Sequence, residues 1–320
     1  MTYTTGDRMD KYWQKNKLEF LNSRHLTAAY SKSFYAASML LPSHRRWGTF
    51  AVYGLCRFAD NIIDNPRNRT TQEILQEIHA LETELKIAYR TGESEHPVLS
   101  PFITTATFFQ IPQEYPLELL KGVCMDLQKK RYKDFDDLYL FCYRVAGVVG
   151  LMMTHVLGYR SAGAFAYAEK LGIALQLTNI LRDIKEDKNM GRIYIPQNEM
   201  KRFKVSQKEL LNETMSPRMQ ELVLFQMKRA HDYYEKAHPG IAMLLPESQF
   251  AIYAASEIYR GILYKLEQQG YNPFKSRIYV TQSKKISIIL RELIKTRFPF
   301  IKKGDSTFLK NIEKFHYKSL

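Results

Sequence analysis

The amino-acid sequence predicts an all-α protein whose helices form a single domain. Apolar residues recur at helical spacing along most of the chain, which is the main sequence signal for helices. Alternating strand patterns joined by hairpin turns are absent from the sequence, apart from a short ambiguous stretch over 192–195. No internal repeat or low-complexity linker divides the 320 residues, and a chain of this length can bury a substantial core.

Cap signals mark where the predicted helices begin. Thr70 with Glu73, and Ser206 with Glu209, form two capping boxes that each open a helix. Ser216, followed by a proline, opens another. The main predicted helices cover 44–64, 70–89, 97–109, 114–130, 134–158, 161–187, 217–238, 247–268 and 281–297.

The two ends of the chain are distinguished from the helical domain between them. We divide it into an N-terminal extension (1–22), the helical domain (23–298) and a basic C-terminal tail (299–320). The first residues contain acidic side chains and no apolar core, unlike a signal or transit peptide. We expect no apolar run of the roughly 18 residues that span a bilayer. Three widely spaced cysteines suggest reduced thiols, so we predict a cytoplasmic protein.

The chain is strongly basic. Its net charge is +14, and ten Lys/Arg against three Asp/Glu from Lys284 onward contribute +7 of it. Such a segment attracts nucleic acid, anionic lipid or a phosphorylated substrate. A solvated basic surface is the simplest interpretation of the tail alone. We predict no nucleic-acid partner and leave a peripheral membrane contact open; the sequence predicts no oligomeric state.

The predicted helix over 44–64 is apolar on nearly all sides, as in a buried central helix. It nevertheless carries one polar stripe, formed by Tyr53, Arg57, Asp60 and Asp64. Counted from Tyr53, these residues lie at sequence offsets of 0, +4, +7 and +11. At 3.6 residues per turn these side chains fall within an arc of roughly 60°.

The predicted helix over 161–187 repeats this pattern. Its stripe spans about 80° and consists of Gln176, Asn179, Asp183 and Asp187. A lone Asp-x-x-x-Asp is usually a solvated helix face. The duplication, the apolar surroundings and nearby arginines at 57, 182 and 192 instead favour two facing carboxylate clusters.

Two facing carboxylate clusters require cations, because an unpaired buried charge costs several kcal/mol or more. Oxygen ligands favour Mg²⁺ over Zn²⁺, and Mg²⁺ typically takes one or two carboxylates beside water and phosphate oxygens. The clusters therefore predict a diphosphate held through Mg²⁺, with Mn²⁺ as the alternative ion. Arginines beside carboxylates form simple ion pairs, but they also clamp diphosphate oxygens.

The rest of the predicted cavity is apolar. Small and aromatic residues interleave over 34–38 and 143–150. Gly147 and Gly150 either permit close helix packing, which is the commoner role, or leave room for an isoprenoid chain. Aromatic rings would stabilise carbocations through their π faces, and the candidates are Phe34, Phe50, Tyr53 and Tyr143.

These segments resemble the squalene/phytoene synthase family. Residues 53–64, YGLCRFADNIID, are similar to its first aspartate motif, and 175–187, LQLTNILRDIKED, followed by GRIYIP, are similar to its second. Residues 30–42 resemble its first substrate-binding helix and 143–150 its central tyrosine–glycine segment. The resemblance covers about 24–297. Two departures are Tyr30, where relatives often have a His, and the first motif at Ala59-Asp60, where relatives often have a further acidic residue at one of the inner positions.

The resemblance implies a single isoprenoid-synthase helical domain with a central cavity. The implied metal ligands are Asp60, Asp64, Asn179, Asp183 and Asp187. The implied substrate-binding residues are Ser31, Phe34, Arg57, Gln176, Asn179, Arg182, Arg192, Arg277 and Lys284. The implied catalytic residues are Tyr53, Arg57, Tyr143, Arg182, Tyr194 and Tyr259.

The reaction that the resemblance implies is a Mg²⁺-dependent head-to-head condensation of two prenyl diphosphates through a cyclopropylcarbinyl diphosphate. The stretch 271–285 and small residues at 36–38 favour geranylgeranyl diphosphate as substrate and phytoene as product. Two enzymatic alternatives stay open: a dehydrosqualene or squalene synthase acting on farnesyl diphosphate, where only the squalene branch uses NADPH, and a prenyl-diphosphate phosphatase. A non-enzymatic basic helical protein would leave the acidic stripes unexplained.

Overall fold

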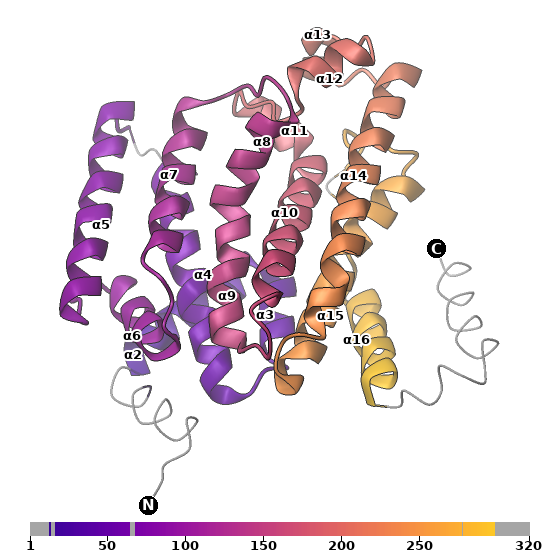
Figure 1. Ribbon diagram of the computed structural model, residues 1–320. Helices are drawn as coiled ribbons and strands as arrows, with labels where there is room; N and C mark the ends of the chain where they lie inside the picture. Colours follow the sequence, from indigo (N-terminus) through magenta and orange to yellow (C-terminus); the bar gives the residue numbers. More distant parts are fainter. Residues whose placement is uncertain (1–12, 14–16, 65–67, 277, 298–320) are drawn as a thin grey trace, which may run out of the picture.

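The computed structural model describes residues 13, 17–64, 68–276 and 278–297 (Figure 1). In these ranges the chain forms helices and no strand, and backbone bridges are limited to Arg131–Ile193 and Tyr159–Leu244. The all-α prediction is confirmed. The helices are α2 (Lys17–Tyr30), α3 (Lys32–Ser38), α4 (Ser43–Asp64), α5 (Thr71–Thr91), α6 (Leu99–Phe109), α7 (Glu114–Gln128), α8 (Phe135–Cys142), the π-helical turn η1 (Tyr143–Gly147), α9 (Val148–Leu157), α10 (Ala164–Arg182), α11 (Ile184–Asn189), α12 (Gln197–Arg202), α13 (Gln207–Leu211), α14 (Pro217–Ile241), α15 (Pro246–Gln268) and α16 (Gln282–Arg297).

The predicted cap signals are present in the structure. The Thr70 hydroxyl accepts a hydrogen bond from the Glu73 amide at 3.2 Å, and the Glu73 carboxylate accepts one from the Thr70 amide at 2.7 Å. Ser206 and Glu209 form the same reciprocal pair at the start of α13. Ser216 caps α14, which runs past its predicted end near 238 and contains a proline in its last turn. Local side-chain chemistry therefore sets these helix starts.

The predicted helix over 134–158 is interrupted by the π-helical turn η1, on either side of which lie α8 and α9. This segment lies very close to α10. A Cβ added to Gly150 would lie 2.4 Å from the Ala168 carbonyl oxygen, and one added to Gly172 would lie 2.2 Å from that of Ala146. Close helix packing therefore accounts for the missing side chain at Gly150.

The predicted helix over 161–187 is not continuous. It breaks at Asp183, whose backbone leaves helical geometry at φ −104° and ψ 14°, so that α11 starts in a new direction. The Asp183 amide still donates to the Asn179 carbonyl at 2.9 Å, and the Asp187 amide donates to the Asp183 carbonyl at 2.8 Å. The polar stripe thus survives the break.

The segment Phe135–Leu157 is long and apolar enough to cross a membrane by length and composition, since it contains an 18-residue window with a mean hydropathy of 1.6. The expectation that no apolar run has this length is therefore wrong. The segment lies in the middle of the helix bundle and contacts α4, α7 and α10 (Figure 1). Its burial inside the protein accounts for its composition.

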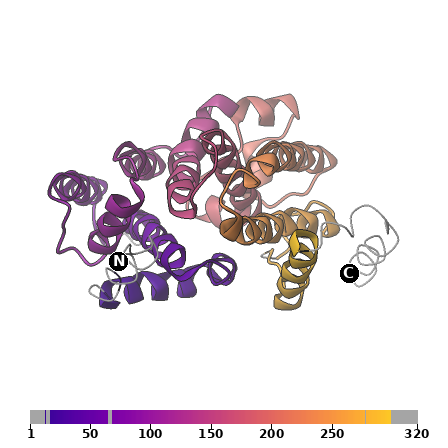
Figure 2. The same ribbon diagram turned by 60° about the horizontal axis from the view of Figure 1, so that its bottom comes forward.

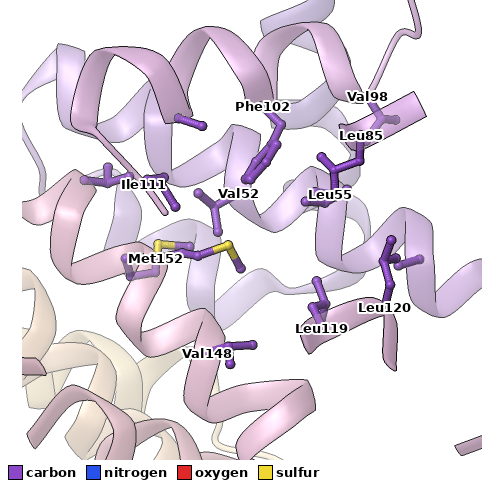
Figure 3. Close-up of a cluster of buried hydrophobic side chains, with 14 of the residues drawn as sticks. Val52, Leu55, Leu85, Val98, Phe102, Ile111, Leu119, Leu120, Val148 and Met152 are labelled. Carbon is purple, nitrogen blue, oxygen red and sulfur yellow. The ribbon is translucent and has the colours of Figure 1, made fainter. Parts of the chain in front are cut away.

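Two large clusters of buried side chains hold the bundle together. One includes side chains of α4, α5, α6, α7 and α9, and Figure 3 shows Val52, Leu55, Phe102 and Met152 converging in it. The other joins α8 and α10 to α14 and α15. In Figure 2 the indigo N-terminal helices lie mainly to the left, and the orange and yellow helices α14–α16 lie mainly to the right. The two halves meet along α9 and α10, and α3 of the N-terminal half also contacts α15.

A smaller aromatic cluster fixes the start of the chain. Phe20 of α2 is fully buried against Trp47 and Phe50, and Trp13 stacks on Trp47 with ring centroids 4.4 Å apart. The packed part of the protein therefore begins before the boundary expected at residue 23. Phe50 belongs to this cluster and not to the cavity, so the structure contradicts its predicted role toward carbocations. The predicted tail, 299–320, lies outside the described residues.

Candidate active site

A cavity of about 670 Å³ runs between the helices. Its lining follows α10 from Ala164 to Arg182, about 27 Å at 1.5 Å per residue. What we term the polar end is lined by Arg57, Asp60, Asp64, Asp126, Asn179, Arg182, Asp183, Asp187 and Arg192. What we term the apolar end is lined by Met153, Leu157, Ala164, Tyr167, Ala237, Ile241, Leu244 and Ile252.

The two predicted aspartate pairs meet at the polar end. Asp60 and Asp64 lie on the last two turns of α4, and Asp183 and Asp187 lie at the junction of α10 with α11. Burial and the neighbouring Asp64 raise the pKa of Asp60 to about 7. Burial and the neighbouring Asp183 raise the pKa of Asp187 to about 8. The polar end therefore concentrates negative charge that the protein alone does not neutralise.

These residues fit a cation that is shared with a bound ligand. In the described part of the chain, no three His, Cys, Asp or Glu side chains are arranged to hold a metal ion by themselves. The Asn179 side-chain oxygen is buried without a hydrogen-bond partner beside the second aspartate pair. Carboxylate and amide oxygens with open positions suit Mg²⁺, which keeps water and phosphate among its ligands.

Three arginines surround the aspartates. Arg57 lies with Nη1 3.9 Å from Asp64 Oδ2, its guanidinium 4.2 Å from the centre of the Tyr30 ring, and its buried Nε has no hydrogen-bond partner. Arg182 donates from Nε and Nη2 to Asp183 at 2.7 and 2.5 Å. The third arginine, Arg192, lies with Nη1 3.5 Å from Asp64 Oδ1. Guanidinium groups in this position can exchange a carboxylate for a diphosphate.

Asp126 of α7 also lies at the polar end and was not predicted. It is 7% exposed, and its Oδ1 accepts a hydrogen bond from the Tyr194 hydroxyl at 2.5 Å. Its charge acts on both Asp60 and Asp187, one from each predicted pair. The only sequence signal was a lone carboxylate within the apolar stretch GVCMDL, which is too common a pattern to select it.

A model of the squalene/phytoene synthase family matches residues 27–284, which include both aspartate pairs. The chain belongs to the squalene/phytoene synthase family. It is 36% identical over 275 residues to the 15-cis-phytoene synthase of Synechococcus elongatus, covering 82% of this chain and 88% of that protein. It is 35% identical to the 15-cis-phytoene synthase of Synechocystis sp., covering 82% and 81%.

Solved structures agree with the family assignment. The fold matches a crystal structure of a dehydrosqualene synthase with a TM-score of 0.83 at 30% identity, covering 89% of this chain and 99% of that one. A squalene synthase from Alicyclobacillus acidocaldarius shares the fold, with a TM-score of 0.74 at 23% identity over 81% of this chain and 97% of that one. The predicted isoprenoid-synthase fold and the prenyltransferase class are thereby confirmed.

Most of the other predicted site residues of this synthase line the cavity. Ser31, Phe34, Tyr53, Gln176, Tyr194 and Tyr259 all do so. The Ser31 and Tyr259 hydroxyls lie 3.5 Å apart, and the rings of Phe34 and Tyr53 stack with centroids 5.2 Å apart. Gln176 Oε1 accepts a hydrogen bond from Asn179 Nδ2 at 3.3 Å. Aromatic faces and hydroxyls thus lie beside the aspartates.

Two of the described site residues that were predicted, Tyr143 and Lys284, do not line the cavity of this synthase. Tyr143 lies outside its lining, and burial together with the nearby Glu169 carboxylate raises the pKa of the phenol. The turn η1 contains Tyr143, and Phe141 and Val145 line the cavity on either side of it. Lys284 lies on α16, away from the lining, and Arg277 falls outside the described residues.

Proposed function

We propose that this synthase joins two geranylgeranyl diphosphates head to head, through a cyclopropylcarbinyl diphosphate, to form phytoene for carotenoid biosynthesis. One observation carries the proposal: two aspartate pairs share the polar end of a long, otherwise apolar cavity. The names of the cyanobacterial relatives, 15-cis-phytoene synthase, support the twenty-carbon substrate.

In this proposal the two aspartate pairs would hold Mg²⁺, which would supply positive charge for the departing diphosphate. Asp60 and Asp64 would hold it from α4, and Asn179, Asp183 and Asp187 from the junction of α10 with α11. Arg57 and Arg192 bind diphosphate oxygens that the aspartates cannot hold. Fixed charges of this kind stabilise a transition state most where bulk water is excluded.

The apolar part of the cavity protects the reaction. Prenyl chains lie toward the apolar end, and the stacked rings of Phe34 and Tyr53 present π faces to the allylic cation. Attack by the second double bond is productive only while water is excluded. The tyrosines at 194 and 259 remain candidate catalytic groups because their side chains line the same cavity.

Product analysis tests this function. The full chain is incubated with Mg²⁺ and either farnesyl or geranylgeranyl diphosphate, with and without NADPH, and the extract is analysed by mass. A forty-carbon hydrocarbon formed without NADPH is the expected result. A thirty-carbon product would assign the dehydrosqualene or squalene branch, and a prenyl alcohol alone would assign a phosphatase.

The same proposal includes a peripheral membrane contact, because the substrates and product are lipids. Ile286 and Leu290 on α16 are 58% and 53% exposed and lie one turn apart, as on helices that lie in a membrane interface. The basic segment from Lys284 onward complements anionic lipid. A cytoplasmic location remains a prediction.

Vesicle sedimentation tests the contact. Replacing both Ile286 and Leu290 by Glu is expected to reduce binding to anionic vesicles, whereas Leu224→Glu on α14, where the leucine is 47% exposed, leaves it unchanged. Equal binding by both variants would eliminate α16 as the contact. Deleting 298–320 separates a contribution of the tail from that of the helix.

A further inference from the structure

Asp126 differs from the four predicted aspartates in position and in contacts. It lies on α7, outside both Asp-x-x-x-Asp patterns, where its side chain is 10% exposed against 36% for Asp64. Burying an isolated carboxylate is costly, so such a group is retained where it has fixed partners. Asp126 has two, and each belongs to the segment that follows the second aspartate pair.

The two carboxylate oxygens of Asp126 have different partners. Oδ1 accepts the hydrogen bond from the Tyr194 hydroxyl at 2.5 Å, and Oδ2 lies 3.3 Å from Arg192 Nη1. The backbone anchors the same segment, since the Ile193 amide donates to the Lys130 carbonyl at 3.1 Å, one turn beyond Asp126. Asp126 therefore joins α7 to the segment that carries Arg192 and Tyr194.

Arg192 lies between two carboxylates that differ in solvent exposure. Its Nη1 is 3.3 Å from Asp126 and 3.5 Å from Asp64, and Asp64 is the more exposed. A carboxylate that binds a metal ion can no longer hold an arginine with the same strength, because the cation repels the guanidinium. Once Asp64 is used for metal, Asp126 is the carboxylate that still fixes Arg192.

We propose that Asp126 is a positioning residue that holds Arg192 and Tyr194 toward a bound diphosphate while Asp64 serves the metal. The inference rests on the proposed function for the presence of a diphosphate, but not for the length of its prenyl chain. In this arrangement Asp126 contacts neither metal nor substrate. It sets the direction of one diphosphate-binding group and one tyrosine hydroxyl.

The test is a double-mutant cycle between Asp126→Asn and Arg192→Gln in the full chain. The measurement is calorimetric binding of inorganic pyrophosphate with Mg²⁺. Each single variant is expected to weaken binding about tenfold, the scale of one charge-assisted contact. The double variant is expected to bind no more weakly than Arg192→Gln alone, because both changes remove the same interaction. Losses that multiply to about a hundredfold would overturn the proposal.

A titration with Mg²⁺ at fixed pyrophosphate excludes a direct metal role. Positioning predicts that Asp126→Asn changes the half-saturating Mg²⁺ concentration no more than Arg192→Gln does; a much larger change for Asp126→Asn would make it a metal ligand and overturn the proposal. The matched control is Asp137→Asn, whose carboxylate pairs with Lys129 away from the cavity. Its affinity is expected to match the wild type, and an equal loss there would mean a general charge effect.

Unfolding temperatures of the variants provide a second measurement that does not depend on ligand binding. Arg192→Gln leaves a buried carboxylate without its charged partner, whereas the double variant removes both charges. We expect the double variant to unfold at a temperature no lower than Arg192→Gln. If Asp126→Asn does not fold, comparing Arg192→Gln with the double variant still decides the proposal. A thirty-carbon product from the wild type would refute phytoene synthesis and leave this cycle valid, because pyrophosphate is common to both branches.

Discussion

The two ends of the cavity are stabilised in opposite ways. At the apolar end, the groups that tie the helix ends together find their partners within the protein. Arg45 donates to the Val156 carbonyl at 2.7 Å and to Glu247 at 3.1 Å, and the Ser248 hydroxyl donates to the Leu157 carbonyl at 2.7 Å. These contacts join α4, α9 and α15 without any ligand.

At the polar end, like charges gather and some polar atoms lack partners. Asp60 and Asp187 have raised pKa values because each is buried beside another carboxylate. Arg57 Nε and Asn179 Oδ1 are buried without hydrogen bonds. The comparison shows that only one end of the cavity is complete in the protein alone. The other is organised for ligands, as expected where function opposes stability.

The largest expected effect follows from removing one of the clustered carboxylates. Asp60→Asn should lower turnover about a hundredfold to a thousandfold, the scale found for lost electrostatic stabilisation of a transition state. The measurement is steady-state formation of the hydrocarbon product with Mg²⁺. Asp136→Asn, at an exposed carboxylate on α8, is the control and should retain activity. Turnover of Asp60→Asn close to that of the wild type would refute the metal-binding role of the aspartates.

The same substitution should stabilise the metal-free protein. Asp60 has a folded-state pKa of about 7, above the value near 3.9 of an unfolded chain. Its contribution to stability therefore falls as pH rises between these values and stays low above them. In EDTA, Asp60→Asn should unfold at a higher temperature than the wild type, with a larger difference at pH 8 than at pH 5. A lower unfolding temperature at pH 8 would contradict the comparison.

At the apolar end, a substitution should change substrate preference and not chemistry. Ala237→Leu fills space near the end of α14, where the side chain is buried against the cavity. We expect kcat/KM for the twenty-carbon diphosphate to fall about tenfold relative to the fifteen-carbon one, since a few carbons in an apolar pocket have effects of this size. Equal losses of kcat/KM for both substrates would show that the apolar end does not discriminate between prenyl chains of different length.

A smaller effect is expected at Tyr30, which borders the polar end. Its ring lies 4.2 Å from the Arg57 guanidinium, and an exposed contact of this kind contributes about 0.5–1 kcal/mol. Tyr30→Ala should raise KM for the prenyl diphosphate about threefold with little change in kcat, whereas Tyr30→Phe keeps the ring and should resemble the wild type. A Phe variant as impaired as Ala would assign the effect to the hydroxyl.

The contrast between the ends also explains what the sequence could predict. Both aspartate stripes follow helical periodicity, so Asp60 and Asp183 could be found from spacing alone. Asp126 and Tyr30 act through contacts between segments far apart in the chain, which no local pattern encodes. The π-helical turn at Tyr143 shifts the register of side chains by one residue, and α-helical spacing does not reveal it. The break at Asp183 was likewise hidden, because its backbone hydrogen bonds continue the helix on either side.

The smallest expected effect tests whether the apolar end is only a scaffold. Ser248 is fully buried, and Ser248→Ala leaves the Leu157 carbonyl without its hydrogen bond, which should cost about 1–2 kcal/mol of unfolding free energy. Urea unfolding measures this loss, and KM and the ratio of products should stay unchanged. If the substitution instead alters the product ratio, the contacts that close the apolar end also shape the chain-binding space. The hydrogen bond from Ser248 to the Leu157 carbonyl would then contribute both to stability and to product specificity. The contrast between the two ends would then apply to their charged groups, whereas the shape of the cavity would depend on both ends.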